Sequence, residues 1–135
     1  MPSRRQPIVL LLDEHTPSLN GLADVLHDHG LRIVCTSNGR QALEALEEGP
    51  LPDAILFDPW LIEMKAQAFV DAVRERDAWA SIPILALHDR FLDVDHKLTG
   101  VHRVIKPITP SGVQRLVADL QSAFKRDTPP DPTDT

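Results

Sequence analysis

Short apolar runs alternate along the chain with longer segments in which hydrophobic residues recur at helical spacing. Residues 8–12 and 54–57 are apolar throughout, and further strands are predicted at 31–35, 82–87 and 101–105, where a few other residues interrupt the apolar ones. Continuous apolar runs of this length are typical of strands that are buried on both faces of a parallel sheet. Pro83 cannot donate a ladder hydrogen bond, so we expect it at the start of its strand.

Amphipathic helices are predicted between these strands. They run from Thr16 to Gly30, from Ala42 to Gly49, from Met64 to Val73 and from Thr109 to Phe124. Residues 89–99 are ambiguous and predict a short or irregular helix. Strands that alternate with helices indicate an α/β fold, in which right-handed crossovers cover both faces of a parallel sheet with helices.

The composition sets the size and surface of the molecule. The 135 residues correspond to one domain, which we expect to span residues 1–126. Residues 127–135 contain only Pro, Asp and Thr, so we expect a disordered tail or a linker remnant there. The formal net charge of −6 argues against direct nucleic-acid binding, because an acidic surface repels phosphate backbones.

The location expected from the sequence is the cytoplasm. The apolar run at residues 8–12 is too short for a signal peptide, and no stretch is long enough to span a membrane. Cys35 is the only cysteine, so no internal disulfide is available, which fits a reducing compartment. We expect Cys35 to be a small buried core residue.

Charged residues follow four of the five predicted strands. Asp13 and Glu14 follow the first strand, Asp58 the third, His88 the fourth and Lys106 the fifth. If the strand order is 2-1-3-4-5, these side chains converge at the carboxyl edge of the sheet, where ligands bind in such folds. Crowded carboxylates favour a hard cation such as Mg²⁺, and a nearby lysine would counter the charge of a phosphoryl group. The set suits phosphoryl transfer to a carboxylate, although any one of these residues alone would be an ordinary loop residue.

In these features the sequence resembles the receiver domains of bacterial two-component response regulators over roughly residues 7–125. The resemblance rests on the segments Ile8–Glu14, Pro52–Asp58, Ile82–Leu87 and Val104–Pro107. It implies a flavodoxin-like, doubly wound fold of five βα units with strand order 2-1-3-4-5.

The resemblance also implies roles for individual residues. Asp58 would be the phosphoacceptor, and Lys106 would contact the acyl phosphate. Pro107 would fix the lysine loop through a cis peptide bond. The Mg²⁺ ligands would be Asp13, Glu14, Asp58 and the backbone carbonyl of Trp60.

Three positions depart from the family pattern. His88 stands where the family has a Thr or Ser that grips the phosphoryl group, and Arg103 stands where a Tyr or Phe is common. Pro59 removes a backbone N–H directly after Asp58. His88 has three interpretations: a donor that replaces the hydroxyl, a plain polar residue, or a ligand with Asp13, Asp58 or His15 of a metal softer than Mg²⁺.

Two functions therefore stay open within this resemblance. The first is a response regulator that takes a phosphoryl group from a histidine kinase or phosphotransfer protein, with at most self-catalysed phosphorylation and dephosphorylation. It would signal to a downstream protein or a fused effector domain, or as a homodimer, through its fourth helix, fifth strand and fifth helix. The alternative is a pseudo-receiver, a protein-interaction module that works without phosphorylation.

A flavin or cobalamin binder of the same fold is a third hypothesis. It is disfavoured because no Gly-, Ser- or Thr-rich phosphate loop follows the first strand. The apolar pair Trp60 and Leu61 has two interpretations, an exposed partner-binding patch or a cover for the loop after Asp58.

Overall fold

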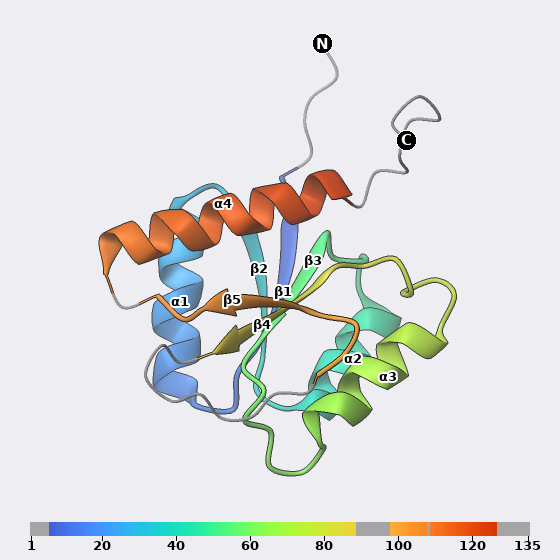
Figure 1. Cartoon of the computed structure of the whole chain (residues 1–135). Helices are drawn as coiled ribbons and strands as arrows, with labels where there is room; N and C mark the ends of the chain where they lie inside the picture. Colours follow the sequence, from blue (N-terminus) through green and yellow to red (C-terminus); the bar gives the residue numbers. More distant parts are fainter. Residues whose placement is uncertain (1–5, 89–97, 108, 127–135) are drawn as a thin grey trace, which may run out of the picture.

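Five parallel strands form one sheet in the order β2-β1-β3-β4-β5, as the sequence predicts (Figure 1). The computed structural model describes residues 6–88, 98–107 and 109–126. The strands are β1 (Ile8–Leu12), β2 (Arg32–Thr36), β3 (Ala54–Phe57), β4 (Ile84–His88) and β5 (His102–Ile105). Every side chain of β1 and β3 is buried, which explains why both read as uninterrupted apolar runs.

Helices cover the sheet on both faces (Figure 1). They are α1 (Thr16–Asp28), α2 (Gly39–Glu48), α3 (Ala66–Glu75) and α4 (Pro110–Arg126), which is the last helix expected from the sequence. Successive strand residues point to opposite faces. Val9 and Leu11 therefore pack toward α1 and α4, whereas Leu10 and Leu12 pack toward α2 and α3. The result is a three-layer α/β sandwich with two apolar cores.

The second strand begins one residue later than the sequence suggested. Gly30 adopts a positive φ of 86° at the end of α1. This turn lets the N–H of Leu31 donate to Leu26 O at 3.4 Å, so Leu31 still belongs to the helix terminus. Pairing with the sheet starts at Arg32. The fourth strand likewise begins at Ile84, directly after Pro83, as the missing proline N–H requires.

Cys35 is exposed, so the prediction of a buried core cysteine is wrong. The reason is the position of its strand: β2 lies at the edge of the sheet and pairs only with β1 among the described strands. Partial desolvation of the thiol still raises its pKa, and the negative charge of Asp24 adds to the rise. Thiolate formation at Cys35 is therefore disfavoured.

Arg74 on α3 donates hydrogen bonds to the backbone before and after β4. Its guanidinium donates to the carbonyl oxygens of Ala80 at 2.8 Å, Ile82 at 2.6 Å and Gly100 at 2.9 Å. Gly100 has a φ of 81°, a conformation that favours glycine. Arg74 therefore ties α3 both to the approach to β4 and to the approach to β5.

Two predictions fall on residues that the structure does not describe. The segment 89–99, for which a short or irregular helix was expected, lies mostly outside the described residues, and so does the predicted tail 127–135. In the part of the chain that is described, no helix has the length and apolar character needed to cross a membrane.

Candidate phosphoacceptor site

The sheet itself positions the charged residues of the site. The backbone N–H groups of Asp13, Asp58 and Lys106 donate to carbonyls of the neighbouring strands at 3.2, 2.9 and 2.9 Å. The hydrogen-bond ladder thus continues one residue past the carboxyl ends of β1, β3 and β5. Because ladder hydrogen bonds fix the backbone, the three side chains start from fixed points at one edge of the sheet.

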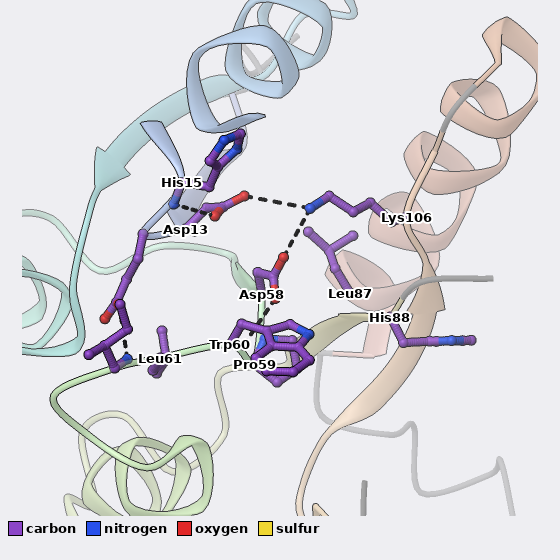
Figure 2. Close-up of a pocket in the computed structure, with 11 residues that line it drawn as sticks. Asp13, His15, Asp58, Pro59, Trp60, Leu61, Leu87, His88 and Lys106 are labelled. Atoms are coloured by element: carbon purple, nitrogen blue, oxygen red, sulfur yellow. Dashed lines mark hydrogen bonds and ion pairs between the residues drawn. The ribbon is translucent and has the colours of Figure 1, made fainter. Parts of the chain in front are cut away.

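The side chains of these three residues meet in a compact charge cluster (Figure 2). The Nζ atom of Lys106 lies 3.0 Å from Asp58 Oδ2 and 4.0 Å from Asp13 Oδ2. Asp58 and Asp13 are both buried, and the Lys106 side chain is 31% exposed. The convergence expected from the strand ends is therefore present for these three residues.

The negative charge of Asp13 is only partly compensated within the cluster. Its Oδ2 atom is buried and has no hydrogen-bond partner among the described residues. Burial raises the pKa of Asp13, and the charge of Asp58 adds to the rise. The N–H of His15 and the charge of Lys106 act in the opposite direction, but burial dominates. Asp13 thus presents an oxygen whose negative charge is incompletely compensated.

Both aspartates also accept a backbone N–H two residues further along the chain. The N–H of His15 donates to Asp13 Oδ1 at 2.8 Å, and the N–H of Trp60 donates to Asp58 Oδ1 at 3.0 Å. Such turns are typical of aspartate. Pro59 has no N–H to offer, so the chain after Asp58 uses the N–H of Trp60 instead.

Glu14 lies beside the cluster, but its carboxylate is engaged elsewhere. Glu14 Oε2 accepts the backbone N–H of Ile62 at 2.9 Å. Among the described residues, no three His, Cys, Asp or Glu side chains come together as a metal-binding group. The described part of the site therefore brings together two carboxylates, those of Asp13 and Asp58, instead of the three acids expected from the sequence.

Neither residue at the family's switch positions has a hydrogen bond or ion pair with Asp58 in the described structure, although His88 lines the same cleft as the cluster. His88 is the last residue of β4, and its ring points away from Asp58 (Figure 2). Arg103 is exposed on β5, where it lines a second cavity of about 760 Å³ together with His88 and Lys106. The cis peptide bond expected before Pro107 is a wrong prediction, because no peptide bond of the described chain is cis. The trans form is the lower-energy isomer even for proline.

A cleft of about 540 Å³ opens above the charge cluster. Its mouth is formed by the loop after Asp58, where Trp60 is 63% exposed and Ile62 is 88% exposed. Leu61, between them, is partly buried and packs against the core on the α2 and α3 side. The two residues of the Trp60–Leu61 pair therefore differ. Trp60 is exposed, as a partner-binding patch requires, whereas Leu61 packs against the core.

Sequence reasoning missed the backbone groups that shape the site. The N–H groups of His15, Trp60 and Ile62 each donate to a carboxylate oxygen. The first two follow an aspartate by two residues, a spacing that predicts such a turn. The contact between Ile62 and Glu14 joins positions 48 residues apart, and no local pattern indicates it.

Comparison with known proteins finds response regulators and a sensor histidine kinase. No protein-family model matches the chain. The two-component response regulator ORR11 of rice, Oryza sativa, is 26% identical over 119 residues, which cover 82% of this chain and 78% of ORR11. The sensor histidine kinase CheAY of Helicobacter pylori is 30% identical over 95 residues, 70% of this chain but 12% of the kinase.

A solved structure agrees with these relatives. The receiver domain of the sensor histidine kinase PA1611 from Pseudomonas aeruginosa, which has a magnesium ion coordinated in its active site cleft, superposes with a TM-score of 0.77. The two are 22% identical, and the match covers 90% of this chain and 99% of that domain. Sequence and fold together support a receiver domain, similar to two-component response regulators in sequence and to solved receiver domains in fold.

Proposed function

We propose that this receiver domain accepts a phosphoryl group on Asp58 with the help of Mg²⁺. The observation that carries the proposal is the buried cluster in which Lys106 Nζ lies 3.0 Å from Asp58 Oδ2 and 4.0 Å from Asp13 Oδ2. A carboxylate that is oriented by an N–H on one oxygen and by an ammonium on the other is held ready as a nucleophile.

The charge cluster fits a magnesium ion. Asp13 Oδ2 is a buried carboxylate oxygen without a hydrogen-bond partner in the described structure, and Asp58 supplies a second carboxylate. Mg²⁺ is commonly held by one or two carboxylates together with water and phosphate oxygens. We propose Asp13 and Asp58 as its ligands, with Glu14 and the backbone carbonyl of Trp60 as the further ligands.

The reaction then follows from the residues of the cluster. A carboxylate oxygen of Asp58 attacks the phosphorus atom of a phosphohistidine, and the O–P bond forms as the P–N bond breaks. The imidazole of the donor leaves with the electron pair and takes up a proton. Lys106 neutralises charge on the transferred group, and Mg²⁺, when bound, supplies further neutralisation of the phosphoryl oxygens.

The proposed donor is a histidine kinase or a phosphotransfer protein. The kinship with CheAY and with the receiver domain of PA1611, both named as histidine kinases, supports this class of donor. We propose that residues 1–126 form the functional domain, located in the cytoplasm. Its output would be a downstream protein, a fused effector domain or a second copy of the chain, reached through β5 and α4 together with the fourth helix expected from the sequence.

The direct test is intact mass spectrometry after incubation with a small phosphodonor and Mg²⁺. Wild-type protein should gain the mass of one phosphoryl group, and Asp58→Asn should gain none. Asp53→Asn, which changes an aspartate at the opposite end of β3, is the matched control and should behave as wild type. If folded wild-type protein gains no mass and forms no beryllofluoride adduct, Asp58 is not a phosphoacceptor.

A pseudo-receiver is the second candidate. It is favoured by His88, whose ring points away from Asp58, and by Arg103, which is exposed on β5 (Figure 2). A module of this kind would bind its partner equally well as wild type and as folded Asp58→Asn. Loss of partner binding in Asp58→Asn would rule this candidate out.

A further inference from the structure

The contact between Glu14 and the loop after Asp58 differs from the other contacts of that loop. Three successive N–H groups, those of Trp60, Leu61 and Ile62, are hydrogen-bonded. Trp60 donates to Asp58 Oδ1 at 3.0 Å and Leu61 donates to Pro59 O at 2.8 Å, so both bonds stay within the local chain. Only the third of these bonds, from Ile62 to Glu14, reaches another element.

The same carboxylate belongs to the acidic pair that follows β1. Asp13 turns its carboxylate into the buried cluster, whereas Glu14 turns its carboxylate to the loop. Glu14 is partly exposed, so its side chain has room to change rotamer. A carboxylate oxygen that accepts the Ile62 N–H has less electron density to offer a cation, and a Glu14 turned toward the cluster leaves that N–H without this acceptor.

We propose that the Glu14 carboxylate alternates between two partners, the N–H of Ile62 in the metal-free domain and the Mg²⁺ site in the loaded domain. The inference rests on the proposed Mg²⁺ site. Metal binding then releases the tether of the loop, and the release acts on the segment that carries the exposed side chains of Trp60 and Ile62 at the mouth of the cleft. By linkage, whatever holds the loop on Glu14 weakens metal binding by the same factor.

Ile62→Pro tests this exchange without touching a carboxylate. Proline removes the N–H donor, and Ile62→Ala is the matched control, because it removes the same exposed side chain and keeps the donor. Mg²⁺ binding is measured by titration of the amide resonances of Asp13 and Asp58 in NMR spectra of the full chain. Ile62→Pro should bind Mg²⁺ about two- to tenfold more tightly than Ile62→Ala, the range of one net hydrogen bond.

A double-mutant cycle separates the exchange from an indirect effect of proline. In a Glu14→Gln background the Ile62→Pro substitution should no longer improve binding, because the charged acceptor is gone.

A second measurement uses wild-type protein alone and does not depend on the folding of a variant. Exchange of the Ile62 amide hydrogen should speed up severalfold when Mg²⁺ saturates the site.

Each result decides the matter. Three results would overturn the change of partner at Glu14 while leaving the metal site intact. They are equal Mg²⁺ affinity of Ile62→Pro and Ile62→Ala, a gain in affinity that persists with Glu14→Gln, and an Ile62 amide whose hydrogen-exchange rate does not depend on Mg²⁺. Absence of any Mg²⁺-dependent shift at Asp13 and Asp58 in wild type would overturn the proposed metal site, and the role of Glu14 with it.

Discussion

Asp13 reduces the stability of the metal-free domain, and an Asp13→Asn variant should recover that stability. Asp13 is 3% exposed, and its Oδ2 atom has no hydrogen-bond partner among the described residues. Burial raises the pKa of the carboxyl above 3.8, and the charge of Asp58 raises it further. Asparagine keeps Oδ1 as acceptor for the N–H of His15 and removes the buried charge.

The size of the effect follows from the extra penalty of a buried charge, because the neutral Nδ2 of asparagine would take the buried place of Oδ2. The penalty for a buried group without its partner is about 1–3 kcal/mol, and more for a charged group. The loss of attraction to Lys106, whose Nζ lies 4.0 Å away, offsets part of the gain. We therefore expect Asp13→Asn to raise the free energy of unfolding by about 1–2 kcal/mol at pH 7 without metal.

The sign of the pH dependence follows from the raised pKa of Asp13. The folded state holds the proton more tightly than the unfolded state, so wild-type stability falls as the pH rises from 3.8 through the folded-state pKa. Each unit of upward shift corresponds to about 1.4 kcal/mol. The advantage of Asp13→Asn should thus be absent at the acid end of this window and grow to a plateau above it.

Urea unfolding followed by circular dichroism, in EDTA and at several pH values, measures this difference. Asp53→Asn is the control, because Asp53 Oδ2 already accepts the N–H of Ile8 at 2.8 Å, and it should give no gain. Excess Mg²⁺ should stabilise wild type but not Asp13→Asn, because a ligand stabilises only the state that binds it. An Asp13→Asn variant that is less stable than wild type at pH 7 in EDTA would refute the argument.

Three further predictions follow from the same contacts. Lys106→Met removes the ammonium next to Asp13, so the pKa of Asp13 should rise further, and carboxyl carbon NMR titration measures the shift; an unchanged or lower pKa would contradict it. Arg74→Met leaves three backbone carbonyls without their donor and should lower the free energy of unfolding by about 1–3 kcal/mol. Urea unfolding measures the change, and a loss below about 0.5 kcal/mol would count against Arg74 as the residue that holds these carbonyls. His88→Ala should change the extent of phosphorylation by less than about twofold, because the ring points away from Asp58, and a tenfold loss by intact mass would show that the ring contacts the phosphoryl group.

Much of the fold could be predicted because buried parallel strands have a distinctive pattern. The runs at β1 and β3 are apolar throughout, and each ends at an acid, so both their type and their end are readable from the sequence. The pattern is less informative at the edge of the sheet. The apolar residues of β2 suggested a buried strand, but Cys35 is exposed, because a strand with one described neighbour is covered less completely than a central strand.

The candidate site could be predicted as far as backbone position determines it. Asp13, Asp58 and Lys106 converge because the sheet places their backbones at one edge, and strand order alone predicts that edge. Side-chain direction depends on rotamers and loop contacts that have no period in the sequence. Glu14 and His88 also follow or end strands, yet one turns to the loop and the other away from Asp58.

The contacts of Asp58 indicate where a change in its charge acts first. Its two oxygens are bound to the N–H of Trp60 and to Lys106. A phosphoryl group on Asp58, as proposed, would add strong acceptor oxygens that compete for both donors. Trp60 lies in the loop that leads into α3, and Lys106 directly follows β5, so both segments would feel the competition directly. His88 and Arg103 have no such contact with Asp58 in the described structure. A response that starts at the loop and at Lys106 would therefore need neither of the two residues that replace the family's hydroxyl and aromatic side chains.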